Sequence, residues 1–174
     1  MSEAKEIYNS IIETGKEFSI CHCGMLAMDT MRMESGYLHW GHDISPEENQ
    51  YQAGLQFAIS YKKNVDFIGK TNLLKMKDHK PNKCLFMLTL DDSKPGEPLL
   101  LHDEPIYDEK GIIGRTTSGN YSFNYNKNLA FGYIKTSLSK EELAKQKIFI
   151  EVERKKYPAS VILKPLNQKN IKSI

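Results

Sequence analysis

The run Lys83-Cys84-Leu85-Phe86-Met87-Leu88-Thr89-Leu90 is a compact apolar stretch in an otherwise mixed sequence. Turn-forming residues bound it on both sides, with Pro81-Asn82 before it and Asp91-Asp92 after it. A short apolar run between such turn signals is typical of a strand in the interior of a β-sheet. The sequence therefore predicts a buried strand here.

Further short strands are predicted downstream of this run, over residues 98–101, 112–118, 129–134, 148–153 and 159–163. Turn residues such as Glu109-Lys110-Gly111 and Lys155-Lys156 separate them. Ser139-Lys140-Glu141-Glu142 has the pattern of a capping box and predicts one short helix that ends near Gln146. Short strands at this spacing favour a β-barrel or sandwich over a parallel sheet with crossover helices.

The first 80 residues have a helical pattern instead. Apolar residues at helical spacing predict an amphipathic helix over residues 3–14, whose apolar stripe needs a partner. Further helices are predicted over residues 25–33 and 71–76, and Ser45-Pro46-Glu47-Glu48 has the signature of a short helix start.

Composition limits the class of protein. The chain has 174 residues, 40% of them hydrophobic, which is enough for a packed core. A formal charge of +2 is too weak a bias to predict nucleic-acid binding.

No apolar run approaches the ~20 residues of a membrane span, and the first residues lack the apolar core of a signal peptide. Three cysteines, two of them near neighbours, suit a reducing compartment. We expect a cytoplasmic protein, or one of the mitochondrial matrix if the source is eukaryotic.

The Cys21-His22-Cys23 run, with His39 and His42 further on, contains the residue types of a zinc site. Its spacing argues against zinc, because paired cysteine ligands are normally further apart and no second matched pair exists. No metal site is predicted. A catalytic cysteine is equally unsupported, since Cys84 lies in an apolar strand where burial raises the pKa of a thiol.

The run His39-Trp40-Gly41-His42-Asp43 is the densest polar and aromatic cluster of the chain. Histidines beside a carboxylate and an indole can bind a planar ligand or shuttle a proton. Alternatively, Trp40 anchors a core and the histidines lie on a loop. The residues alone favour the structural alternative.

Arg32 and Glu34 carry charges inside a methionine-rich stretch, so at least one of them needs a partner. One alternative is a buried ion pair between Arg32 and a carboxylate, joining two segments. The other is a guanidinium that points into a ligand cleft and binds an anionic group. The hydroxyl-rich run Thr116-Thr117-Ser118-Gly119-Asn120-Tyr121 is assigned to a turn.

The stretch Ala27-Met28-Asp29-Thr30-Met31-Arg32-Met33-Glu34, which leads into Tyr37-Leu38-His39-Trp40-Gly41-His42-Asp43-Ile44, resembles the glycine-cleavage T-protein (aminomethyltransferase) family. Further motifs match in order at residues 23–27, 52–55, 66–70, 113–119 and 128–134. Together they look like the C-terminal half of that family and span almost the whole chain. Met28 and the motif His39-Trp40-Gly41-His42 look more like the T-protein-like C-terminal region of sarcosine and dimethylglycine dehydrogenases.

The resemblance implies an α+β fold, in which the end of a folate-binding T-protein-like domain (residues 1–65) precedes a small antiparallel β-barrel (residues 66–165). Residues 166–174 are expected to form a loose tail. The family binds tetrahydrofolate in a central cavity and transfers to it a one-carbon unit from an aminomethyl or methylamine-derived donor. Arg32, Tyr37 and Trp40 stand where the wall of that cavity turns towards the barrel, so the resemblance implies that they bind folate.

The family's key carboxylates lie upstream of the matched region, so no catalytic residue is assigned, and neither Asp29 nor Asp43 takes those roles. We expect a C-terminal segment or split subunit of a transferase, acting in glycine cleavage or methylated-glycine oxidation. A missing N-terminal half or a partner subunit would complete the folate cavity, and a flavin enters only with a separate dehydrogenase domain. The other partner would be a small-molecule amine donor, with no nucleic acid or membrane. The alternative is a non-catalytic binding or assembly module that retains the T-protein fold.

Overall fold

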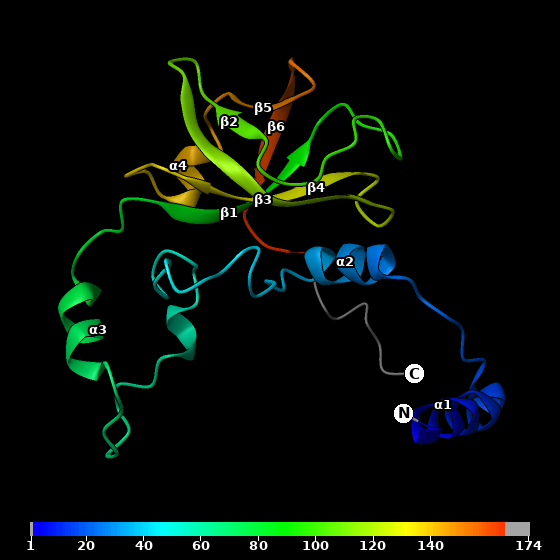
Figure 1. Ribbon diagram of the computed structural model, residues 1–174. Coiled ribbons are helices and arrows are strands. Elements are labelled where there is room, and N and C mark those ends of the chain that lie inside the picture. Colours follow the sequence, from blue (N-terminus) through cyan, green and yellow to red (C-terminus); the bar gives the residue numbers. More distant parts are fainter. Residues whose placement is uncertain (1, 166–174) are drawn as a thin grey trace.

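The computed structural model of the chain describes residues 2–165 (Figure 1). The helices are α1 (Ser2–Gly15), α2 (Met25–Glu34), α3 (Lys70–Lys77) and α4 (Lys140–Leu143), with short 3-10 helices η1 (Lys16–Phe18) and η2 (Gln56–Ala58). The strands are β1 (Cys84–Leu90), β2 (Pro105–Tyr107), β3 (Ile112–Ser122), β4 (Lys127–Ile134), β5 (Ile148–Val152) and β6 (Lys155–Ile162).

The strands form a closed barrel in the order β1-β4-β3-β2-β5-β6, and β6 pairs back with β1. Every neighbouring pair is antiparallel. Closure leaves no free sheet edge, which is one way an all-β unit avoids pairing with other chains. The expected α+β fold with a small antiparallel barrel is confirmed.

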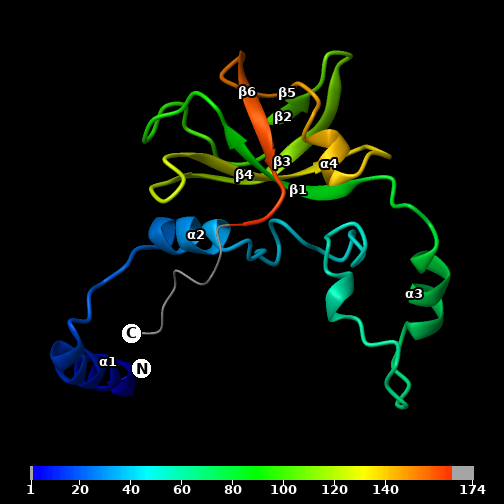
Figure 2. The same ribbon diagram turned by 180° about the vertical axis from the view of Figure 1, so that it is seen from behind.

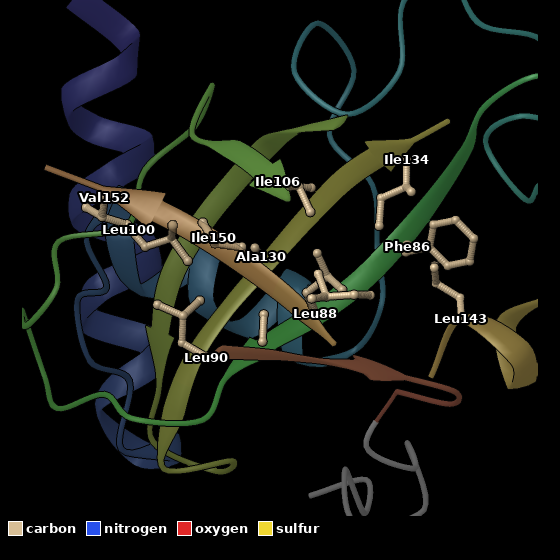
Figure 3. Close-up of a cluster of buried hydrophobic side chains, with 12 residues drawn as sticks. Phe86, Leu88, Leu90, Leu100, Ile106, Ala130, Ile134, Leu143, Ile150 and Val152 are labelled. Atoms are coloured by element: carbon tan, nitrogen blue, oxygen red, sulfur yellow. The ribbon is translucent and has the colours of Figure 1, made fainter. Parts of the chain in front are cut away.

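Strand β1 is apolar except for Thr89 because both of its faces are buried. Phe86, Leu88 and Leu90 point into the barrel, where they join the main hydrophobic core (Figure 3). Leu85 and Met87 point outward and join a second cluster on the outside of the barrel. The period of two along a strand thus divides the run between two cores.

Helix α2 covers the outer cluster and attaches the N-terminal part of the chain to the barrel. Its Met33 is buried against the outward-facing side chains of β4, Leu129, Phe131 and Tyr133. The helix contacts β3 and β4. This packing places the end of α2 and the loop after it against the barrel wall.

The remaining N-terminal elements lie away from the barrel. Figures 1 and 2 show α1 and α3 at opposite ends of the N-terminal part, with α2 between them. Among the described residues before β1, only Met33 and Ala53 belong to the buried hydrophobic core. The N-terminal part therefore has no core of its own. None of the helices in residues 2–165 is long and apolar enough to cross a membrane.

Most of the predicted elements are confirmed, including α1, α2, α3, the capping box of α4 and five of the strands. The predicted strand over residues 98–101 is wrong, because this segment is irregular and the short strand β2 follows it. Only Leu100 among its three leucines enters the barrel core, so the apolar run reflected one buried side chain and not a strand. The proposed tail after Pro165 lies outside the described residues.

Two local predictions also need correction. Ser45 begins a turn, not a helix, although its hydroxyl accepts a hydrogen bond from the Glu47 amide at 3.1 Å and donates to Glu48 at 2.7 Å. Glu48 instead binds Lys83 at the start of β1. The predicted turn over residues 116–121 is part of β3, because pairing with β4 continues to Ser122.

Candidate functional site

The candidate site lies where the loop after α2, residues 35–45, crosses the outside of strand β3. Helix α2 ends at Glu34, and Gly36 reverses the chain with a positive φ of 76°. That backbone conformation favours glycine. The loop then returns to the barrel, where Asp43 lies against the hydroxyl side chains of β3.

Asp43 has no exposed surface, yet its carboxylate is fully engaged. One carboxylate oxygen accepts hydrogen bonds from the hydroxyls of Thr117 at 2.6 Å and Ser118 at 2.8 Å. The other oxygen accepts from the Arg32 guanidinium at 2.7 Å and from the backbone amide of His39 at 2.9 Å. A buried carboxylate is tolerated when it is paired and hydrogen-bonded in this way.

Arg32 is the cation of this network, and its side chain is only 14% exposed. Besides Asp43, its guanidinium donates to Asp29 at 2.8 Å and to Ser118 at 2.9 Å. It also donates to the backbone carbonyl of Tyr37 at 3.3 Å. Arg32 therefore joins three segments, namely helix α2, the loop after it and strand β3.

Glu34 forms a second polar contact between α2 and the barrel. Its carboxylate accepts hydrogen bonds from the hydroxyl of Ser122 and the side-chain amide of Asn124, both beyond the far end of the Asp43 network along β3. Glu34 is buried. Two buried carboxylates thus fix α2 to the barrel at separate points.

The residues predicted to bind folate fall into two groups. Tyr37 is 57% exposed and Trp40 is 66% exposed, so both rings offer surface on the loop. Arg32 is largely buried and donates a hydrogen bond to the backbone carbonyl of Tyr37. Arg32 forms the ion pair that joins segments. The loop that this pair holds also carries the two rings expected to line the ligand wall.

A small pocket with three histidines lies beside the network, with a volume of about 190 Å³. The rings of His39 and His42 are 4.7 Å apart between centroids, and those of His42 and His102 are 6.3 Å apart. The buried Nδ1 of His39 has no hydrogen-bond partner among residues 2–165. The sequence pattern does not indicate His102, because it lies 60 residues after His42 and strand β1 comes between them in the sequence.

A larger cavity of about 560 Å³ lies on the other side of His42. Glu48 and Lys83 form an ion pair of 2.8 Å at its wall. Burial opposes ionisation of Glu48, but the Lys83 ammonium and the Ser45 hydroxyl outweigh it and lower the pKa of this carboxyl group. Burial, with the nearby carboxylates of Glu48 and Asp43, raises the pKa of Tyr133, whose hydroxyl donates to the Asp43 backbone carbonyl at 2.9 Å.

The cysteines remain free thiols. Cys21 and Cys23 are exposed, and among residues 2–165 no group of three potential ligands is placed to hold a metal ion. Burial raises the pKa of the Cys84 thiol, as the strand pattern predicts.

Thr117 and Ser118 are the residues of this site that sequence reasoning missed. The sequence pattern predicts a turn at these positions, yet both side chains contact Asp43, which is more than 70 positions earlier in the chain. One signal was present in the sequence, namely two consecutive hydroxyl side chains in a predicted strand. Hydroxyl groups that are buried in a barrel need a polar partner, so such a pair indicates a contact with a polar residue elsewhere in the chain.

Two models of protein families match the sequence. The GCVT N-terminal domain matches residues 1–63, and the glycine cleavage T-protein C-terminal barrel domain matches residues 83–167. The second range contains all six strands of the barrel.

Similar proteins include human mitochondrial dimethylglycine dehydrogenase, 35% identical over 162 residues, which are 92% of this chain and 18% of that protein. The aminomethyltransferase of Chloroherpeton thalassium is 34% identical over 169 residues, 96% of this chain and 44% of that protein. The chain therefore spans less than half the length of these relatives.

A crystal structure shows the same fold. The glycine cleavage system aminomethyltransferase T from Bartonella henselae superposes with a TM-score of 0.70 and 25% sequence identity, over 82% of this chain and 38% of that one. Fold, motifs and both family models agree, and the chain belongs to the glycine cleavage T-protein family.

Proposed function

We propose that the chain contributes the barrel and one wall of the folate cavity in a tetrahydrofolate-dependent one-carbon transferase. The observation that carries this proposal is the loop with Tyr37 and Trp40, which exposes two aromatic rings and is attached to the barrel by the Arg32–Asp43 network. Family membership supports a folate-dependent transferase role.

The wall suits a planar ligand. Exposed indole and phenol rings offer flat apolar surface with polar edges, which fits the stacked rings of a folate. In this proposal Tyr37 and Trp40 contact the folate, and Arg32 holds the loop through its hydrogen bond to the Tyr37 carbonyl. Folate would serve as the acceptor of the one-carbon unit, while this chain's residues bind and orient it.

The wall is only one side of a cavity. One-carbon capture needs a positioned carboxylate and exclusion of water, and an exposed wall supplies neither. We propose that the N-terminal half of the fold, in the same polypeptide or in a partner subunit, brings the remaining walls and the catalytic groups. The chain alone is then not a competent enzyme, and no residue of residues 2–165 is assigned a catalytic role.

The relatives indicate the chemical class of the amine donor but not its identity. Aminomethyltransferases and the dimethylglycine and sarcosine dehydrogenases are matched at similar identity, so an aminomethyl group and a methylated glycine are both candidates. A flavin belongs to the proposal only if a dehydrogenase domain is attached. We place the protein in the cytoplasm, or in the mitochondrial matrix as the name of the human relative suggests for a eukaryotic source.

The second candidate is a non-catalytic binding or assembly module that retains the fold. The engagement of Arg32 favours it, because all three guanidinium nitrogens, Nε, Nη1 and Nη2, already donate to groups of this protein. Such an arginine stabilises the fold whether or not a ligand binds.

Calorimetry with tetrahydrofolate tests the proposal. The chain alone should show little heat of binding, and a complex of the chain with the N-terminal half should bind one folate per complex. Trp40→Ala should weaken that binding, while Leu99→Ala, at a similarly exposed apolar residue between β1 and β2, should leave it unchanged. Tight binding by the chain alone, or a complex that binds no folate, would contradict the proposal; the second result would support the binding module.

A further inference from the structure

The cavity of about 560 Å³ beside His42, here called the barrel-end cavity, lies between the loop after α2 and the barrel. Its lining residues come from residues 41–48, from the chain at the starts of β1, β2 and β3, and from the end of β4. Asp43 fixes this loop to β3, so the cavity does not depend on the elements before α2. Small-molecule sites usually have volumes of roughly 300–1,000 Å³. Neither Tyr37 nor Trp40 lines it.

Three basic and three acidic side chains line the barrel-end cavity, and four of these six are paired with each other. Glu48 accepts hydrogen bonds from the Lys83 ammonium at 2.8 Å and from the Ser45 hydroxyl at 2.7 Å, which engages both of its oxygens. Asp103 is paired with Arg115. These contacts neutralise two cations and two anions of the wall and leave one of each sign.

Lys135 and Glu47 are the two charged residues of the wall that remain. Within residues 2–165, neither side chain forms an ion pair or a hydrogen bond. Lys135 also has a second cation near it. Cys84 of β1 pairs with Ile134 of β4, and Lys83 and Lys135 are the next residues on these two chains. Like charges at neighbouring positions of paired strands repel each other, and an anion bound at Lys135 would reduce that repulsion.

The rest of the wall offers apolar surface. Pro105, Ile112 and Ile113 line the cavity together with the charged residues, and Ile112 is 65% exposed. Contact with an aliphatic group would remove this surface from water, which is favourable. An inorganic ion would leave it exposed. One unpaired cation, one unpaired anion and an aliphatic wall therefore match a small zwitterion that carries an aliphatic group.

We infer that the barrel-end cavity binds a free amino acid with an aliphatic side chain. Its carboxylate pairs with Lys135, its ammonium group pairs with Glu47, and its side chain lies against Pro105 and Ile112. Charge-assisted hydrogen bonds of this kind are stronger than neutral ones. The ligand has no net charge, as the six charged side chains of the wall together have none. The inference goes beyond the proposed function and does not rest on it.

Titration of the ¹⁵N-labelled chain with leucine, followed by two-dimensional NMR, locates the site. Amide signals of Gly114, Lys135 and residues 41–48 should shift and saturate, whereas that of Asn126, in the turn between β3 and β4, should not move. The ligand is small, so we expect a Kd of about 10 mM or below. Shifts that do not saturate, or that are as large at Asn126 as at Lys135, overturn the inference.

Two matched ligands test the recognition of each charge. In the first, 4-methylpentanoate, the ammonium group of leucine is missing, and in the second, 3-methylbutylamine, the carboxylate is missing. Each should bind at least about tenfold more weakly than leucine, because one charged contact is lost. If either ligand binds as tightly as leucine, the charge that it lacks is not recognised and the assignment to an amino acid is wrong.

Two variants assign the contacts to residues. Lys135→Met should weaken leucine and 4-methylpentanoate by about tenfold without weakening 3-methylbutylamine, and Glu47→Gln should weaken leucine and 3-methylbutylamine without weakening 4-methylpentanoate. Both side chains are exposed, so the fold should be retained. Lys94→Met, at an exposed lysine outside the cavity, is the control and should change none of the three. A variant that weakens all three ligands equally, or a control that weakens leucine as much as Lys135→Met does, overturns the inference.

Discussion

Asp43 decides how the N-terminal part meets the barrel. It is a fully buried anion with Arg32, Thr117 and Ser118 as side-chain partners. Removing water from a carboxylate costs much free energy, and the ion pair with hydrogen bonds on every oxygen offsets that cost. The pair is then sensitive to the loss of either partner.

The first prediction concerns Arg32. Arg32→Ala leaves Asp43 buried without its cation, so the free energy of unfolding should fall by about 3–5 kcal/mol. Arg32→Lys should lose less, because a positive charge remains without the planar fork. Urea unfolding followed by circular dichroism measures both. A loss below about 1 kcal/mol in Arg32→Ala would show that the pair contributes little to stability.

The second prediction concerns Glu48, whose pKa in the folded protein lies below its ordinary value of 4.5. A lowered pKa means that the ionised form is stabilised by folding, so the Lys83 pair contributes stability above pH 4.5 and loses it as pH falls through the folded pKa. Glu48→Gln should therefore be less stable than the original at neutral pH, with the difference shrinking below pH 4.5. Thermal melts across that range give the comparison. A difference that stays constant with pH would rule out the pair as its cause.

At the scale of elements, the barrel walls approach each other closely at Gly132 on β4. A Cβ added there would meet the Ile106 side chain at 2.6 Å and the Arg115 carbonyl oxygen at 2.8 Å. A side-chain atom can move aside, but the backbone of a paired strand cannot do so without breaking its register.

The third prediction follows from that close approach. Gly132→Ala should destabilise the barrel by about 1–3 kcal/mol through overpacking. Gly24→Ala is the matched control, because a Cβ at that position has open space around it. Thermal unfolding of the two variants decides the matter. Equal midpoints would mean that the strands can separate to make room.

Elements were predictable from sequence where their signal is local. The β1 run and the capping box at Ser139 are examples, since turns bound the first and the second needs only two residues three positions apart. The β2 strand was missed because three residues give no pattern, and its pairing depends on β3 and β5.

The site was predictable only in part for the same reason. The loop with Tyr37 and Trp40 was recognised from its motif, whereas the roles of Thr117 and Ser118 depend on a contact across more than 70 residues. Long-range polar contacts leave no periodicity in a single sequence. The family resemblance located the loop, and the structure identified what holds it.

At the scale of the molecule, stability is distributed unevenly. The barrel contains the main core and closes on itself, while α1 and α3 contribute none of the buried hydrophobic residues. Regions with few buried apolar contacts open at low free energy.

The fourth prediction is a gradient of hydrogen exchange in the isolated chain. Backbone amides of β1 and β4 should exchange slowest, those of α2 should be intermediate, and those of α1 and α3 should exchange fastest. Mass spectrometry of exchanged peptides resolves these segments. Protection of α1 and α3 equal to that of the barrel in the isolated chain would contradict this uneven distribution of stability.

Trp40 is the only tryptophan of the chain, so its fluorescence reports directly on the proposed folate wall. The measurement is the lifetime of Trp40 emission in the complex with a tryptophan-free N-terminal half, titrated with tetrahydrofolate, because a lifetime is insensitive to absorption of light by the ligand. A ligand stacked near the indole should shorten the lifetime in proportion to the fraction of complex that has bound folate. A lifetime that stays constant while calorimetry records folate binding would contradict the placement of Trp40 in the cavity wall.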